Sequence, residues 1–140
     1  MPLRHIAIAS KDPDKSAEFY IKNFGFKLVR TTDRPTQYGH VLTDGVINLA
    51  VLDFKVAGAA GVEFGTEFEG LHHIGFEVES PSEVGKQVTE NGARARTDIN
   101  EALGMKKGVT SRGEMKYTGP DGVLFDLSEP GFWKFEAPKD

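Results

Sequence analysis

The stretch LHHIGFEV, residues 71–78, places two adjacent histidines at the start of an apolar run. It has a counterpart near the N-terminus in LRHIAIAS, residues 3–10. In a strand, successive side chains point to opposite faces of the sheet, and both stretches alternate in this way. Because a His-Ile pair stands at the same place in both, we predict that the chain repeats one folding unit.

The segment that follows each of these strands is typical of a helix. Residues 11–25 have Asp12 as an N-cap and Gly25 as a stop, with a proline at the first helical position. Residues 80–92 repeat this punctuation, with Ser80 as the N-cap, again a proline next, and a glycine at the end. The repeat therefore extends beyond the strands.

Three further strands are predicted after each helix. In the first half they are FKLVR, the segment around YGHVL, and VINLAVLDF; in the second half they are ARART, EMKYTGPDG and VLFDLSEP. An Asp-Gly pair precedes the last strand of both halves. We therefore predict a single domain over residues 1–140, with β-α-β-β-β modules at about 3–54 and 71–130 and a linker at about 55–70.

The composition excludes several classes of protein. A chain of 140 residues with 39% hydrophobic residues is long enough for one domain with a core. The net charge of −4 argues against broad nucleic-acid binding, and no apolar run is long enough for a membrane span. The absence of cysteine removes disulfides and thiolate metal sites. We expect a soluble cytoplasmic protein that acts on a small molecule.

Alternation along the strands brings four polar side chains to one face of the sheet. His5 and His73 match each other in the repeat, and both point away from the face that packs on the helices. Asn48 and Asp126 lie on this histidine side of the last strands, between apolar residues, where polar groups are costly unless paired. His72 has the opposite parity, which predicts a place over the helix face or at the rim of the strand.

Two imidazoles, a carboxylate and an amide on one concave surface form a ligand set for a divalent ion. Zinc, nickel, cobalt, manganese and Fe(II) all accept such ligands. His5, His73 and Asp126 also match the facial triad of non-haem iron oxygenases. The alternative is that these are separate polar residues, each satisfied by its own hydrogen bonds.

Four segments carry a resemblance to a known family: LRHIAIAS, EFYIKNFGF, LHHIGFEV and KYTGPDGVLFDLSEP. Together they resemble the vicinal oxygen chelate superfamily, the glyoxalase, bleomycin-resistance and extradiol-dioxygenase group, over about residues 3–130. The resemblance implies an α+β fold in which two βαβββ modules form a cupped mixed sheet around one metal ion. It also implies a homodimer.

The resemblance implies one metal ligand from the first and last strand of each module. These are His5, Asn48, His73 and Asp126. Many members have Glu at the position of Asp126, and Glu, His or Gln at the position of Asn48. These departures leave the expected fold intact and bear on the choice of chemistry.

Three functions are compatible with this site. The first is a glyoxalase- or epimerase-like lyase or isomerase, in which the metal polarises a carbonyl and a carboxylate moves a proton. Glu77 is the candidate base because it shares the strand face of His73, and Glu114 and Asp126 are further candidates. The second is an Fe(II) extradiol-type dioxygenase in which Asn48 does not coordinate and Tyr117 or His40 acts as an acid near the metal.

The third function is a metal-free, small-molecule-binding protein of the resistance type. Phe132, Trp133 and Phe135 near the C-terminus either line an apolar groove or cap the sheet. Residues 97–113 are predicted to form a long glycine-bearing loop, and we interpret this loop as a lid over the site. Its basic residues suit an anionic substrate tail.

Overall fold

The computed structural model describes residues 1–105 and 113–136. The first half contains β1 (Leu3–Ala9), α1 (Pro13–Phe24), β2 (Lys27–Asp33), β3 (Gln37–Thr43) and β4 (Asn48–Phe54). The second half contains β5 (Gly70–Glu77), α3 (Pro81–Glu90), β6 (Arg94–Ala95), β7 (Met115–Thr118) and β8 (Leu124–Ser128). Two short helices, α2 (Ala57–Ala60) and α4 (Thr97–Ala102), and the 3-10 turn η1 (Pro120–Gly122) complete the described elements.

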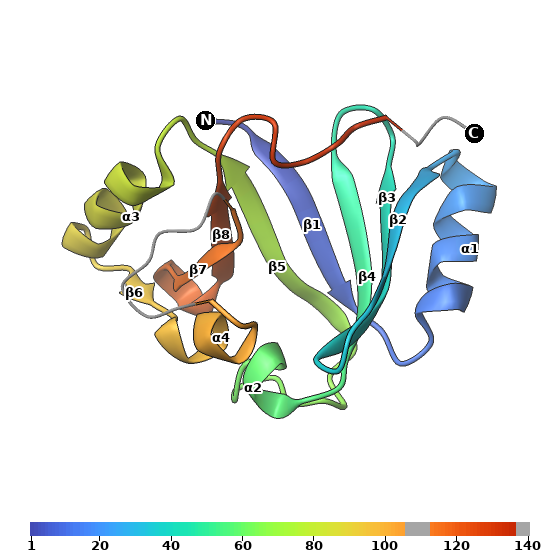
Figure 1. Cartoon of the computed structure of the whole chain (residues 1–140), viewed down its shortest axis with the longest axis horizontal. Coiled ribbons are helices and arrows are strands. Elements are labelled where there is room, and N and C mark those ends of the chain that lie inside the picture. The colour runs from blue at the N-terminus through green and yellow to red at the C-terminus, as the bar shows by residue number, and fades with distance from the viewer. Residues whose placement is uncertain (106–112, 137–140) are drawn as a thin grey trace.

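The eight strands form one mixed sheet in the order β2-β3-β4-β1-β5-β8-β7-β6. The sheet curves into a cup, with α1 and α3 outside it at opposite ends (Figure 1). Each module pairs its first and last strands in parallel, β1 with β4 and β5 with β8. The predicted α+β fold of two βαβββ modules is confirmed. Antiparallel pairing of β1 with β5 joins the modules within a single chain.

The ends of α1 follow from its sequence. The Asp12 side chain accepts a hydrogen bond from the Lys15 backbone N–H at 3.2 Å, and Pro13 begins the helix. Gly25 ends it in the left-handed conformation, with φ of 73°. In α3, the Ser80 hydroxyl accepts from a backbone N–H of the first turn in the same way.

In each module the outward face of the sheet packs on a helix, which leaves the other face to line the cup. Leu49 and Val51 of β4 pack with Ala17 of α1 in one buried cluster. In the second half, Leu127 of β8 lies in a cluster against which Val84 of α3 packs. Alternation therefore directs the intervening side chains, among them the polar ones, into the cup.

Two segments differ from the sequence-based prediction. The predicted linker contains α2, and the predicted loop at residues 97–113 begins with α4, in which Ile99 is completely buried. A single buried side chain and tertiary contacts stabilise such short helices, and these leave no periodic pattern in the sequence. Residues 106–112 lie outside the described residues, and with them part of the predicted lid, including its basic side chains Lys106, Lys107 and Arg112.

One guanidinium holds these two segments together. Arg96 is buried, and its two terminal nitrogens lie 2.6 and 2.8 Å from the Glu63 carboxylate oxygens. It also bonds both carboxylate oxygens of Asp98 at 3.1 Å.

No helix in the described part of the chain is long and apolar enough to cross a membrane.

Candidate metal centre

Three side chains from adjacent strands meet inside the cup: His5 of β1, His73 of β5 and Asp126 of β8. One ligand atom from each lies within 4.8 Å of the others. Asp126 Oδ2 is 3.0 Å from His5 Nε2 and 3.3 Å from His73 Nε2. All three residues are buried, so this polar cluster lies in a low-dielectric environment.

A glycine makes room for the cluster. Gly75 lies directly across from His5 in the pairing of β1 with β5, and beside Asp126 in the pairing of β5 with β8. A Cβ atom on Gly75 would lie 2.0 Å from His5 Cδ2 and 2.5 Å from Asp126 Oδ1. The imidazole of His5 therefore occupies the space that a side chain at position 75 would need, so only glycine fits there.

The protonation states of the cluster suit a metal ion. Burial, and then the charge of Lys116, lower the pKa of His73 to about 3, so its imidazole is neutral at pH 7. Burial raises the pKa of Asp126, but its electrostatic interactions with His5 and Lys116 outweigh burial and hold that pKa well below its usual range. A neutral imidazole and an ionised carboxylate are the forms that bind metals.

Asn48 lies beside His5 across the pairing of β1 with β4. It is 1% exposed, and neither atom of its amide has a hydrogen-bond partner among the described residues. The Nδ1 atom of His5 is also buried without such a partner. Unsatisfied buried polar atoms are costly, and a bound ion or water at the centre would satisfy them. The residues present therefore fit a divalent ion.

Lys116 completes the charged part of the site. It pairs with Asp126 between β7 and β8, and its Nζ lies 3.5 Å from Asp126 Oδ2. The ammonium also donates to the backbone carbonyl of Glu114 at 3.4 Å. Sequence reasoning missed Lys116, although alternation from Tyr117, which faces α3, would have directed it into the cup.

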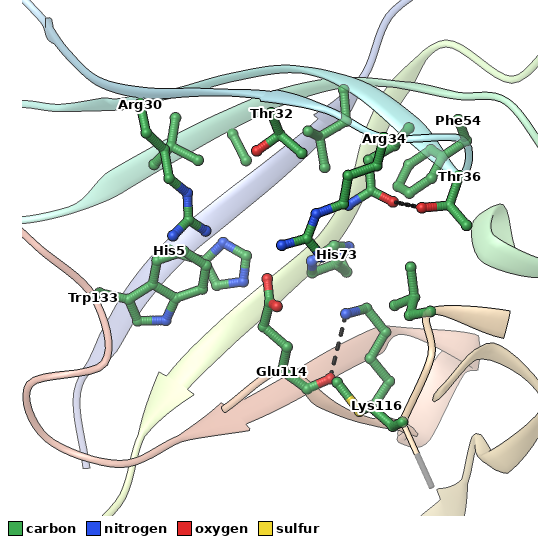
Figure 2. Close-up of a pocket in the computed structure, with 16 residues that line it drawn as sticks. His5, Arg30, Thr32, Arg34, Thr36, Phe54, His73, Glu114, Lys116 and Trp133 are labelled. Carbon is green, nitrogen blue, oxygen red and sulfur yellow. Dashed lines mark hydrogen bonds between the residues drawn. The ribbon is translucent and has the colours of Figure 1, made fainter. Parts of the chain in front are cut away.

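Figure 2 shows the cavity beside the cluster, with a volume of about 150 Å³. Arg30 and Arg34 extend from β2 and the turn after it, and Glu114 enters from the opposite wall. Glu114 has a φ of 64°, an uncommon conformation for a residue other than glycine. The ring of Trp133 lies 4.2 Å from that of His5, centroid to centroid.

Comparison with known proteins identifies the family. The model of the Glyoxalase/Bleomycin resistance protein/Dioxygenase superfamily matches residues 3–127. The chain belongs to this superfamily.

Curated relatives within the superfamily include two bacterial enzymes. The chain is 28% identical over 137 residues to a lactoylglutathione lyase of Escherichia coli O157:H7, covering 92% of this chain and 93% of the relative. A lactoylglutathione lyase of Shigella flexneri gives the same values.

Solved structures support the superfamily fold. Methylmalonyl-CoA epimerase of Streptomyces coelicolor, in complex with 2-nitronate-propionyl-CoA, superposes with a TM-score of 0.66 at 24% identity, covering 92% of this chain and 96% of that one. The Mycobacterium tuberculosis methylmalonyl-CoA epimerase gives 0.65 at 16% identity, covering 92% and 87%. At these identities the likeness concerns the fold alone.

Glu77 and Tyr117, the two candidate catalytic residues, lie away from the cavity of this chain. The Glu77 carboxylate pairs with Arg4 Nε at 2.8 Å at the end of β5. The ring of Tyr117 is buried on the helix face, where its hydroxyl lies against Gly85 of α3, and burial raises its pKa. Neither residue is among those that line the cavity, and their roles as base and acid stay predictions.

His72, predicted over the helix face or at the rim of the strand, lies near the start of β5, where it contacts α2 and not the helix face. In the pairing with β1, Ala7 faces His73 and Ile8 faces Leu71, so His72 is the extra residue of a β-bulge. A bulge breaks alternation, which places both histidines on the same side. His72 Nδ1 contacts His73 Nδ1 at 2.8 Å, and its Nε2 contacts a backbone carbonyl of α2 at 2.6 Å.

Proposed function

We propose that the chain is a divalent-metal-dependent lyase or isomerase of the glyoxalase or epimerase type, acting on a small oxygen-chelating substrate. His5, His73 and Asp126 hold the ion, and Asn48 stands beside them as a fourth polar contact. The buried convergence of two imidazoles and a carboxylate carries this proposal. The curated relatives are lactoylglutathione lyases, which supports the class of reaction.

When bound, the ion supplies Lewis-acid polarisation of a substrate oxygen. Lys116 adds a fixed positive charge in the same pocket, where it stabilises negative charge that develops on the substrate. Low exposure strengthens this effect because the buried ammonium is poorly screened by water. The surrounding strands hold these groups in place, so little reorganisation is needed during the reaction.

Glu114 is the residue that moves the proton. Its carboxylate points into the cavity (Figure 2), and the side chain has no hydrogen bond or ion pair among the described residues. The backbone N–H donates to the Ser128 hydroxyl at 3.2 Å, and the carbonyl accepts from Lys116, which holds the uncommon backbone conformation. Such conformations concentrate at functional sites. Glu77, by contrast, is engaged by Arg4.

A second candidate is an Fe(II) extradiol-type dioxygenase. The observation that favours it is the composition of the centre, because two histidines and one aspartate match the facial triad of non-haem iron enzymes. The two candidates differ in the metal they need. Iron favours the dioxygenase, whereas nickel, zinc, cobalt or manganese favours the lyase or isomerase.

The test is elemental analysis of protein purified without chelator, for the wild type, His73→Ala and His40→Ala. His40 is the matched control, because it bonds Asp14 of α1 outside the cavity. We expect one divalent ion per chain in the wild type and the control, and loss of that ion in His73→Ala. Protein that takes up no metal, even after soaking with these ions, would instead be a metal-free binding protein.

Activity assays then separate the reactions. The relatives suggest two substrates to try first, with formation of lactoylglutathione or epimerisation of methylmalonyl-CoA as the readout. Metal-loaded protein that catalyses neither of them, but cleaves a catechol with consumption of dioxygen, would replace the first candidate by the second.

A further inference from the structure

Three polar side chains alternate along one edge of the cup. Arg30 and Thr32 lie on β2, and Arg34 follows directly after it. Because strand side chains repeat every second residue, all three point to the same face. Each of them lines the cavity that His5 and His73 also line. In Figure 2 the two guanidinium groups extend from their strand toward the interior of this cavity.

Neither Arg30 nor Arg34 has a side-chain hydrogen bond or an ion pair with any described residue. Two other arginines of the chain are engaged: Arg4 pairs with Glu77 at 2.8 Å, and Arg96 holds Glu63 at 2.6 Å. An isolated surface arginine is commonly only hydrated. Arg30 and Arg34 are exposed too, but both line one cavity, where two unpaired guanidinium groups offer an anion a pair of donors.

The charges around the cavity favour an anion. The cationic side chains are Arg30, Arg34 and Lys116, and the carboxylates are Glu114 and Asp126, which leaves an excess of positive charge. A divalent ion at the proposed centre would increase that excess. A positively charged, partly enclosed cavity concentrates anionic ligands, so an anionic group on the ligand would complete the charge balance.

We propose that Arg30 and Arg34 bind an oxyanion group of the substrate, a carboxylate or a phosphate, in the cavity that His5 and His73 also line. This inference rests on the proposed function in one respect, because it calls the bound ligand the substrate. The anion site narrows the substrate class to small molecules with an anionic group separate from the oxygens that chelate the ion. Thr32, between the two arginines, adds a hydroxyl donor to the same oxyanion.

The test is a titration of the ¹⁵N-labelled full chain with malonate and with inorganic phosphate, followed by NMR. It is run at low salt on protein as purified and again after dialysis against chelator, because malonate also binds metal ions. The variants are Arg30→Gln with Arg34→Gln, and Arg94→Gln as a control. Arg94 is an exposed arginine of β6 that does not line the cavity, and its substitution removes charge elsewhere.

We expect the double variant to bind at least one of the two anions about tenfold or more weakly than the wild type, because two charge-assisted contacts are lost. The control should match the wild type within about twofold, since exposed charges at a distance are screened. A preference for malonate would assign the site to a carboxylate, and a preference for phosphate to a phosphate. Equal weakening in the double variant and the control, or no binding to the wild type, would overturn the inference.

The two proposals fail separately. If the wild type holds a metal ion but neither anion binds, the anion site is wrong and the metal centre stands. If no metal binds, but chelator-treated protein still binds an anion through Arg30 and Arg34, the metal centre is wrong and the anion site stands. The arginine variants should retain the metal content of the wild type, because neither residue belongs to the ligand cluster.

Discussion

At the scale of single residues, Lys116 places an ammonium group 3.5 Å from a carboxylate oxygen of the proposed metal ligand Asp126. The same carboxylate cannot neutralise Lys116 and an incoming cation fully at once, and the buried ammonium repels that cation. We therefore expect Lys116 to lower the affinity of the proposed centre for a divalent ion below that of the ligand set alone.

Replacing Lys116 by Met should raise the affinity for divalent ions by about tenfold or more, because a positive charge near the ligands is removed. Competition with a coloured chelator measures this affinity. Lys86→Met, on the exposed side of α3, is the matched control and should leave it unchanged. An affinity of Lys116→Met equal to that of the wild type would mean that the ammonium moves away when the ion binds.

Glu114→Gln should lower kcat by about a hundredfold or more, the range typical for loss of a general base. The metal content should not change, because Glu114 is not one of the ligands. The assay is whichever lyase or epimerase reaction the wild type catalyses. Glu77→Gln is the control, and a larger loss in that variant than in Glu114→Gln would return the role of base to Glu77.

At the scale of elements, β5 positions most of the site, since it carries His73 and brings Gly75 against His5. Gly75→Ala should destabilise the protein by about 3 kcal/mol and impair metal binding, because the new methyl group overlaps His5. Urea denaturation measures the loss. Gly58→Ala in α2 is the control, where the methyl group would approach Ala102 Cβ at 3.2 Å. Equal stability of the two variants would contradict the close approach at Gly75.

Alternation and helix punctuation predicted the elements that repeat. They were sufficient for the modules, the caps of α1, and the meeting of His5, His73 and Asp126 in one cup. They failed where an element departs from its regular period. The bulge at His72 shifts one residue against its neighbour strand, and its position depends on pairing between strands distant in sequence.

Other features of the site depend on tertiary contacts that sequence reasoning did not capture. The short helix α4 is stabilised by burial of Ile99 and by the contacts of Arg96, not by a helical pattern. The alternation of Arg30, Thr32 and Arg34 was visible in the sequence. Its meaning was not, because only the curvature of the sheet brings β2 around the same cavity as the histidines.

At the scale of the whole molecule, two buried imidazoles link stability to pH. Burial lowers the pKa of His72 to about 4 and that of His73 to about 3, both below the value of 6.5 expected in an unfolded chain. The unfolded state therefore binds more protons as pH falls through this interval. The stability of the metal-free protein is fully present above pH 6.5 and decreases toward pH 4.

Each imidazole should contribute a loss of up to about 1.4 kcal/mol per pH unit in this window. Urea denaturation of chelator-treated protein between pH 7 and 5 measures the slope. His72→Gln removes one of the two groups and should show a shallower dependence. A free energy of unfolding that stays constant over this range would mean that the imidazoles remain hydrated in the folded state and keep pKa values close to those of the unfolded chain.

The resemblance to the superfamily also predicts a homodimer. In this chain the two modules already pair through β1 and β5, so a partner is not needed to bring the three ligands together. We expect sedimentation equilibrium to give twice the protomer mass of 15.3 kDa. A monomer that still binds metal would show that the centre works without a partner.

The ring of Trp133 lies against that of His5, and it is the chain's single tryptophan. Emission excited selectively at tryptophan therefore originates beside the proposed metal position and reports on it without any label. Ions with unpaired electrons quench an indole at such close range, whereas zinc does not. The emission intensity during titration would thus distinguish zinc from paramagnetic ions within a single cuvette.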